Sequence, residues 1–205
     1  MSKAILLSIR PEWLAKILNG EKTIEVRKLF PKDYVGWVYM YCSKGKPYLY
    51  GDKSVYEGKQ EYFWVQKIEG NGIVPLLSGK VVARFWCDEV NSVGFNTRCD
   101  YPIISTWAIN RLTRLSCLSP DQLLDYLQGK NGYAIHISKL EIFDKPRELS
   151  EFKRYIDKWD YYSALGKYTL SQPKEKLVVD IKKEFDASLL ITKAPQNFCY
   201  IEGGN

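Results

Sequence analysis

Hydrophobic and polar residues recur with two different periods near the start of the chain. Over residues 11–19 the apolar positions are spaced as on one face of an α-helix, and they are Trp13, Leu14, Ile17 and Leu18. Proline is tolerated in the first turn of a helix and Gly20 closes it, so this segment predicts a helix of two to three turns. Over residues 22–28 the period changes to two, which predicts a β-strand.

The predicted strand carries charge on one face. Side chains alternate along a strand, so Ile24 and Val26 point to one face while Thr23, Glu25 and Arg27 point to the other. We expect the two aliphatic residues to enter the core and the three polar ones to share one surface. An antiparallel strand with one solvated face has the same pattern, and Glu25 and Arg27 would then form a simple surface pair.

The rest of the chain mixes strand and helix patterns. Strand patterns occur at residues 5–9, 37–43, 80–90 and 133–143. Ser119 and Gln122 form a capping box at the start of a helix that ends near Gly129. Two apolar series at helical spacing predict two appended helices, the first from Leu149, Phe152, Ile156 and Trp159 and the second from Leu177, Val178, Ile181 and Phe185.

Several blocks of the sequence are similar to those of one known family. The specific block runs Ser8-Ile9-Arg10-Pro11-Glu12-Trp13, then Ile17-Leu18-Asn19-Gly20-Glu21-Lys22-Thr23, with Glu25 and Arg27 after it. Later blocks at residues 38–46, 79–85, 133–137 and 194–201 agree with it. Together they resemble the ASCH domain (activating-signal-cointegrator homology), a PUA-like β-barrel family, and the last block looks like the closing strand of its larger phage or prophage-type members.

This resemblance implies an α+β fold: a PUA-like mixed β-barrel of about five to seven strands, with flanking helices and a helical C-terminal addition. It implies that residues 1–143 form the barrel, with a glycine- and aromatic-rich loop or hairpin insertion at about 48–79. Residues 144–190 would be the appended helices. Residues 191–205 would be the closing strand and tail of the same single domain.

The resemblance also implies an RNA-binding or nucleotide-recognising cleft beside the first helix. The residues expected to bind nucleic acid there are Lys22, Thr23, Glu25, Arg27, Lys28, Tyr41, Ser43 and Lys44. Lys22 and Lys28 would neutralise phosphate, and Arg27 would grip it with two hydrogen bonds. Glu25 would accept an exocyclic amine of a base, Tyr41 would offer a stacking face and Ser43 a small hydrogen-bonding group.

An enzyme is the first alternative. Some small bacterial ASCH-like proteins hydrolyse the amide of acylated cytidines with a threonine nucleophile, a lysine and a glutamate. Lys22 matches that lysine, but Glu25 stands at the nucleophile position, and Thr23 points differently on the strand. Lys22 and Glu25 are then candidate catalytic residues for acid–base chemistry on a water, as an amidohydrolase or a ribonuclease without metal.

Composition narrows the classes further. The 205 residues are 45% hydrophobic, enough to bury a core in one domain. The single histidine, His136, and five widely spaced cysteines without a Cys-x-x-Cys pair argue against zinc and disulfides, so we expect no metal and no other cofactor. The chain lacks a long apolar run and a signal-peptide pattern, which predicts a cytoplasmic protein that does not span a membrane.

The charge and the aromatic content bear on partners. A formal net charge of +6 favours a polyanionic partner without demanding one. Aromatic residues are interleaved with lysines over residues 34–67, a composition that suits single-stranded nucleic acid as well as ordinary barrel strands. A second alternative is a protein-interaction or regulatory module that uses residues 48–79 or the appended helices. The sequence leaves the oligomeric state open.

Overall fold

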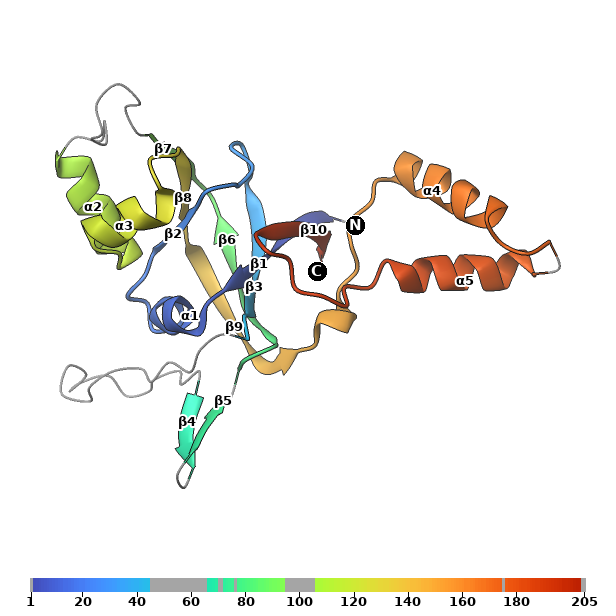
Figure 1. Ribbon diagram of the computed structural model, residues 1–205, viewed down its shortest axis with the longest axis horizontal. Helices are drawn as coiled ribbons and strands as arrows, with labels where there is room; N and C mark the ends of the chain where they lie inside the picture. Colours follow the sequence, from blue (N-terminus) through green and yellow to red (C-terminus); the bar gives the residue numbers. More distant parts are fainter. Residues whose placement is uncertain are drawn as a thin grey trace.

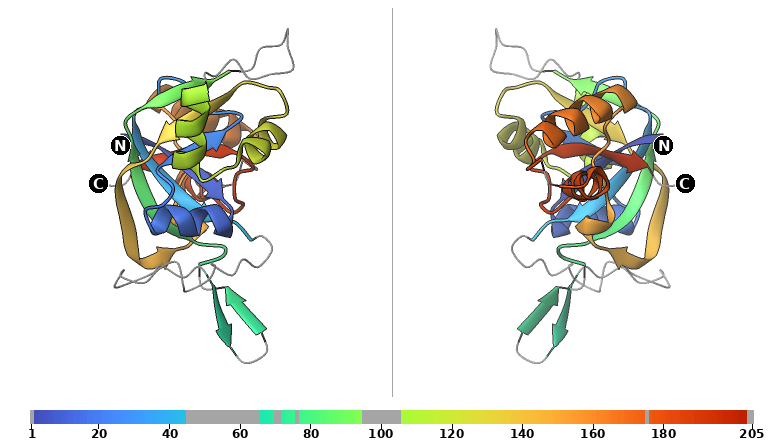
Figure 2. Two further views of the ribbon diagram at one scale, coloured as in Figure 1. Left: turned by 90° about the vertical axis from the view of Figure 1, so that its left-hand side faces the viewer. Right: turned by 90° about the vertical axis from the view of Figure 1, so that its right-hand side faces the viewer.

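Two β-sheets with helices packed around them form the body of the protein, and a pair of helices projects from it (Figures 1 and 2). The structure is a computed structural model that describes residues 2–44, 66–69, 72–75, 77–94, 106–174 and 176–203. The first sheet has the order β10-β1-β3-β6-β9, and the second has the order β2-β8-β7. A separate antiparallel pair, β4 (Gln66–Glu69) and β5 (Gly72–Pro75), stands apart from both.

The first sheet is mixed. Its strands are β1 (Ser2–Ile9), β3 (Gly36–Cys42), β6 (Val81–Cys87), β9 (Ser138–Arg147) and β10 (Phe198–Gly203). β1 pairs parallel with β3, and all the other pairings in this sheet are antiparallel. Ala4, Ile5, Leu6 and Leu7 are all buried, because β1 is an inner strand covered on both faces.

One long bent hairpin joins the two sheets. β6 runs on into β7 (Val90–Val93), and β8 (Gly132–His136) runs on into β9, while β6 pairs with β9 and β7 with β8. The remaining strand of the second sheet is β2 (Ile24–Arg27), which pairs antiparallel with β8. The expected α+β fold is therefore present. Within the described residues, however, β2 does not pair with β10, and this is the pairing that would close the two sheets into a barrel.

Three apolar clusters hold the helices to the sheets. α1 (Pro11–Leu18) packs Leu14 and Ile17 into the main core with Ile5 and Phe85. α2 (Thr106–Ser116) and α3 (Pro120–Leu127) pack on the second sheet through Leu112, Leu123 and Leu127, which surround Val26. On the opposite face of the first sheet, the chain before and after the projecting helices contributes Phe152 and Ile191.

Most predicted elements are confirmed with shifted ends. The helix predicted over residues 11–19 is α1, and it is followed by Gly20 in the left-handed region at φ +74°. The capping box is present at α3, where the Ser119 side chain accepts a hydrogen bond from the Gln122 backbone and the Gln122 side chain accepts one from the Ser119 backbone. The strand predicted over residues 22–28 is shorter and begins at Ile24.

The prediction for the first appended helix is wrong, because the helix begins later in the chain. Residues Leu149–Glu151 form a single 3₁₀ turn, and Lys153 and Arg154 bridge to Leu190 and Ile201. Phe152 is buried beneath this segment, so its apolar spacing reflects packing on the sheet. The helix is α4 (Lys158–Leu170), which begins after Asp157, whose side chain accepts hydrogen bonds from two backbone N–H groups. Most of the predicted insertion at 48–79 lies outside the described residues, apart from β4, β5 and residues 77–79.

The second appended helix is confirmed as α5 (Val178–Ser188). α4 and α5 lie antiparallel, and together they project from the side of the body opposite α1, α2 and α3 (Figure 1). We call this pair the arm. Its two helices are joined by Phe185, whose ring contacts Tyr161 and Tyr168, and by a hydrogen bond of 2.7 Å from the Tyr161 hydroxyl to Asp186.

Candidate functional site

A cleft of about 640 Å³ lies among α1, α3 and β2. This volume falls within the usual range of small-molecule sites. The side chains along it come from elements that are far apart in the sequence. Its described lining is Ser8, Ile9, Arg10, Glu12, Trp13, Lys22, Glu25, Val26, Arg27, Ser43, Leu118, Gln122, Asp125, Tyr126, Gln196 and Asn197.

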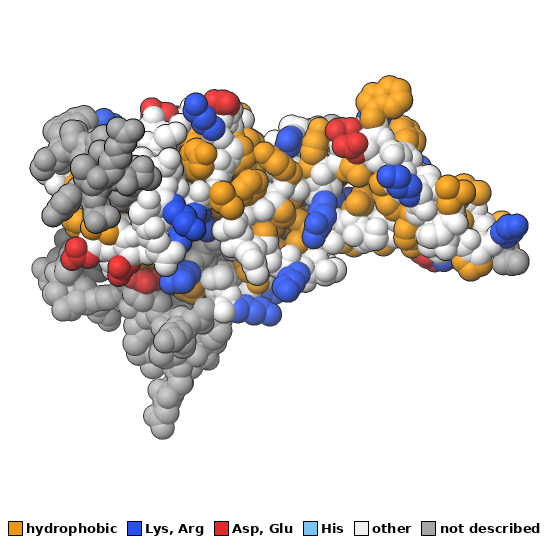
Figure 3. Space-filling view, turned by 45° about the horizontal axis from the view of Figure 1, so that its top comes forward, with side chains coloured by type: hydrophobic (Ala, Val, Ile, Leu, Met, Phe, Trp, Pro, Cys, Tyr) orange, Lys and Arg blue, Asp and Glu red, His pale blue; other side chains and the backbone are white. Residues whose placement is uncertain are grey.

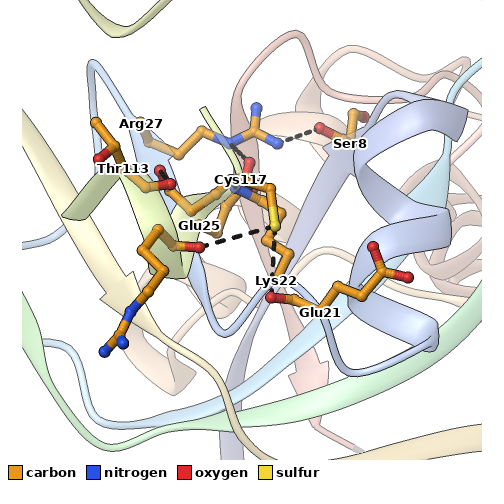
Figure 4. Close-up of polar contacts among 9 residues, drawn as sticks. Ser8, Glu21, Lys22, Glu25, Arg27, Thr113 and Cys117 are labelled. Atoms are coloured by element: carbon orange, nitrogen blue, oxygen red, sulfur yellow. Dashed lines mark hydrogen bonds and ion pairs between the residues drawn. The ribbon is translucent and has the colours of Figure 1, made fainter. Parts of the chain in front are cut away.

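A row of three buried charges lines the cleft (Figure 4). Lys22, Glu25 and Arg27 are only 2%, 5% and 9% exposed. Lys22 Nζ lies 3.3 Å from Glu25 Oε2, and Arg27 Nε lies 2.8 Å from Glu25 Oε1. One carboxylate therefore stands between two cations, with each of its oxygens facing one of them. Removing charges from water is costly, so such a row is stable only because its members compensate one another.

Lys22 is held by the ends of two helices. Its backbone N–H donates to the Lys16 carbonyl of α1 at 3.1 Å. This hydrogen bond holds the chain close to the end of α1 after the turn at Gly20, with the Lys22 side chain directed into the protein. Its Nζ donates to the Ser116 carbonyl at 2.7 Å, at the C-terminal end of α2, where the helix dipole favours a cation. Burial lowers the pKa of Lys22 below the ordinary value of 10.5, and Glu25 opposes that effect.

Arg27 ties the row to the first sheet. Its Nη2 donates to the Ser8 carbonyl at the end of β1, with a separation of 2.5 Å. The Nε atom of Arg27 is buried and makes no hydrogen bond. It forms an ion pair with Glu25, but its N–H does not point at the carboxylate oxygen closely enough to count as a hydrogen bond. The row therefore links β1, β2 and α2 in one polar network.

Aromatic and amide side chains surround the charged row. Lys22 Nζ lies 5.6 Å from the centre of the Trp13 ring, and Lys16 Nζ lies 5.3 Å from it. Tyr126 is exposed on α3, with Lys28 Nζ 5.5 Å from its ring. Amide side chains are supplied by Gln122, Gln196 and Asn197. These groups offer ring faces together with hydrogen-bond donors and acceptors.

The formal charges of the lining cancel. Its cations are Arg10, Lys22 and Arg27, and its anions are Glu12, Glu25 and Asp125. The expected basic cleft is thus charge-balanced in its described part. A ligand there gains more from directed hydrogen bonds and ring contacts than from a general positive potential.

Four of the eight residues predicted to bind nucleic acid lie together in the cleft lining, namely Lys22, Glu25, Arg27 and Ser43. Thr23 precedes β2, and its backbone is used to hold the strand: its N–H donates to Leu115 and its carbonyl accepts from Ile137. Lys28 lies near the cleft beside Tyr126 and donates to the Gln128 side chain at 3.1 Å.

Tyr41 and Lys44 lie elsewhere. Tyr41 is buried on the other face of the first sheet, with Leu6 and Val81, and burial raises the pKa of its hydroxyl. Its predicted place as a stacking face in the cleft is therefore corrected. The reason is strand alternation, which sends Tyr41 and the core residue Met40 to opposite faces of β3. Lys44 is an exposed residue beyond the end of β3 and outside the described lining.

The wall that α3 contributes to the cleft and the contact that α2 makes with Lys22 were not predicted from the sequence. Gln122, Asp125 and Tyr126 are spaced i, i+3 and i+4, so they share one face of α3, while Leu123 and Leu127 turn into the core. That signal was present in the sequence. The Ser116 carbonyl that accepts from Lys22 had no such signal, because a backbone group carries no sequence pattern.

Comparison with known proteins gives fold similarity at low sequence identity. No protein-family model matches the chain, and no curated protein does. Three similar structures are ASCH proteins. ASCH from Zymomonas mobilis has a TM-score of 0.49 and 15% identity, over 97% of this chain and 87% of that one. One mutant form of that protein has a TM-score of 0.49 and 15% identity, over 97% of this chain and 88% of that one. Another mutant form has a TM-score of 0.43 and 16% identity, over 93% of this chain and 100% of that one.

Among the described residues, no group of three or more His, Cys, Asp or Glu side chains is arranged to hold a metal ion. No helix in the described ranges has the length and apolar character needed to cross a membrane.

Proposed function

We propose that the cleft binds a nucleotide, either free or as an unstacked residue of an RNA. The observation that carries the proposal is the buried row Lys22–Glu25–Arg27 along a cleft of about 640 Å³. Buried, mutually compensating charges cost stability compared with apolar packing, and they concentrate at functional sites. Single-stranded RNA is recognised by bases that leave the stack and enter such pockets.

Each part of the lining has a role in this proposal. The Trp13 ring offers a stacking face at one wall, and the amides of Gln196 and Asn197 suit the hydrogen-bonding edge of a base. Arg10 is exposed at the start of α1, where its guanidinium is available to a phosphate. Glu25 has both oxygens engaged, so its role is to hold Lys22 and Arg27 in place rather than to accept a base amine.

Binding is tested by fluorescence anisotropy with labelled short oligonucleotides of RNA and DNA, and by competition with free nucleotides and nucleosides. The proposal expects saturable binding of single-stranded RNA, displaced by at least one mononucleotide. Affinity should fall between low and physiological salt, because each neutralised phosphate releases condensed counterions. A slope that exceeds the number of cations at the cleft would indicate diffuse attraction by the +6 net charge instead.

A second candidate function is hydrolysis, favoured by the lowered pKa of Lys22. A lysine with a lowered pKa gives up its proton more readily and can then take one from an attacking water, and the Glu25 carboxylate, 3.3 Å from Lys22 Nζ, holds the lysine side chain in place. The substrate classes are acylated or otherwise modified nucleosides, or RNA itself. Glu25 stands at the position of the threonine nucleophile, so the chemistry would proceed through water and not through a covalent acyl-enzyme.

Hydrolysis is tested by turnover of an acylated cytidine and of a labelled RNA. Turnover that is lost in Lys22→Met while the variant stays folded and still binds nucleotide would establish catalysis. Binding without turnover of either substrate would establish the recognition module. Tight binding that survives every substitution in the lining would place the ligand outside the cleft and contradict both functions.

A further inference from the structure

The charged side chains that line the cleft fall into two groups. Those of the buried row are committed within the protein, because each cation of the row is engaged with Glu25 and with a backbone carbonyl. The remaining charged side chains of the described lining are exposed or half-buried, so a ligand can reach them. They are Arg10, Glu12 and Asp125, and we call them the accessible charges.

The two groups have opposite formal charge. The row holds two cations and one carboxylate, a formal charge of +1, whereas the accessible charges are one cation and two carboxylates, a formal charge of −1. In the described parts of the chain, none of the accessible charges takes part in an ion pair. Acidic and basic side chains also both reach the surface on the side of the body that Figure 3 shows. The described lining thus has one exposed cation, Arg10, to receive a phosphate, and a further phosphate meets carboxylates.

Glu12 reduces the attraction of α1 for a second anion. It stands in the first turn of α1, directly after the N-cap residue Arg10 and Pro11. The positive end of a helix dipole attracts anions at this position. A carboxylate in the same turn already interacts with the dipole, and it repels another anion at short range. The α1 side of the cleft can therefore hold one phosphate through Arg10 but resists the next.

Asp125 places a second carboxylate on the wall made by α3. It is exposed, and it shares one face of α3 with Gln122 and Tyr126. A carboxylate only accepts hydrogen bonds, so it favours ligand groups that donate them. The hydroxyls of a ribose and the amines of a base are such donors, whereas the oxygens of a polyphosphate are acceptors. This wall is therefore suited to the nucleoside part of a nucleotide.

We propose that the cleft selects a nucleotide with a single phosphate over the corresponding di- and triphosphate, and that Glu12 and Asp125 cause this selection. The inference rests on the proposed binding of a nucleotide in the cleft. It names the chemical class of that ligand, which is a nucleoside monophosphate or one residue of an RNA with its own phosphate. A cleft of about 640 Å³ lies well inside the size range of small-molecule sites, so space does not impose the limit. Repulsion imposes it, as in other sites that discriminate between closely related ligands.

Two lysines lie beside the cleft but outside its described lining. Lys16 Nζ is 5.3 Å from the centre of the Trp13 ring, and Lys28 Nζ is 5.5 Å from that of Tyr126. Both lysines attract every phosphorylated ligand, so they raise the absolute affinities. The ratio of affinities between ligands is therefore the quantity that reports the effect of the two carboxylates.

The selection is measured by isothermal titration calorimetry with the 5′-mono-, di- and triphosphates of the four ribonucleosides. The titrations are made at low salt and near neutral pH, without divalent cations, which would neutralise a polyphosphate. For the nucleoside that binds best, the wild type should bind the triphosphate at least about tenfold more weakly than the monophosphate. This ratio should decrease as salt is added, because repulsion between accessible charges is screened.

Neutral variants test the two carboxylates. Glu12→Gln and Asp125→Asn keep the size of each side chain and remove its charge, so each should reduce the ratio at least about threefold. The double variant should bind the monophosphate and the triphosphate with nearly equal affinity. Asp144→Asn on β9 removes the same charge outside the cleft lining and should leave the ratio unchanged. Circular dichroism should show the same helicity in all variants.

The outcomes separate this inference from the proposed function. If none of the nucleotides binds, the proposed function fails and the inference fails with it. If the wild type binds the monophosphate and does not bind it more tightly than the triphosphate, the selection alone is overturned. A preference for the monophosphate that persists in the double variant and at high salt would show that the shape of the cleft sets the selection, and would overturn the role of Glu12 and Asp125.

Discussion

Lys22 and Glu25 meet in an ion pair of 3.3 Å although they stand at positions of opposite parity along the chain. In an unbroken strand starting at Lys22, their side chains would point to opposite faces. The strand begins instead at Ile24, after a turn that leaves α1 through Gly20, and this frees the Lys22 side chain to turn toward the face that carries Glu25. The charged row is therefore a product of the helix end and the strand together.

Glu25 should be important for stability as well as for the site. Glu25→Gln removes the only charge that compensates Lys22 and Arg27 within the row, so we expect the free energy of unfolding to fall by about 3 kcal/mol. Urea unfolding followed by circular dichroism measures it. Glu141→Gln is the matched control, since it breaks the exposed pair with Arg84 and should cost less than about 1 kcal/mol. Equal losses would show that the row is not buried in solution.

Lys22 should titrate below the usual lysine range. Its pKa in the folded protein is lowered by burial, so between that pKa and the ordinary value of 10.5 the unfolded chain binds more protons than the folded one. The contribution of Lys22 to stability therefore rises with pH across this window. The difference in unfolding free energy between wild type and Lys22→Met, measured at several alkaline pH values, should shift in favour of the wild type. A difference that is constant with pH would contradict the lowered pKa.

The capping box should support the α3 wall of the cleft. Ser119→Ala removes the oxygen that accepts from the Gln122 backbone, and we expect a loss of about 1 kcal/mol in unfolding free energy. Ser119→Asp keeps an acceptor at the same place and should cost much less. Thermal or urea unfolding of the two variants separates the cap from a general effect of substitution. A cost that is the same for alanine and aspartate would show that the cap contributes nothing.

Arg27 should contribute to nucleotide affinity in a way that surface arginines do not. Arg27→Ala removes a guanidinium from the cleft, and we expect a loss of about 1–3 kcal/mol in binding free energy. Arg154→Ala, on the exposed segment before the arm, should cost little. Anisotropy titrations are made under conditions where both variants are folded. Similar losses for the two would indicate nonspecific attraction.

Much of the fold could be predicted because it depends on local patterns. The apolar spacing of α1, the alternation in β6 and β8, and the Ser119 cap each have a signal within a few residues. α4 was misplaced because Phe152 has the spacing of a helix but is buried by contact with a sheet distant in sequence. The same limit applies to the site. Glu25 and Arg27 could be assigned to one face, but the contacts from Ser116 and Ser8 depend on tertiary packing.

The central claim is that the cleft, and not the general charge of the protein, binds the nucleotide. Two tryptophans allow a direct test: Trp13 lines the cleft, and Trp159 stands 85% exposed on the arm. The measurement is the affinity of Trp13→Ala and Trp159→Ala for the mononucleotide that competes best, by isothermal titration calorimetry. We predict that Trp13→Ala loses about 1–3 kcal/mol of stacking free energy while Trp159→Ala binds as the wild type does. Unchanged affinity in Trp13→Ala, or equal losses in both variants, would contradict the assignment of the cleft.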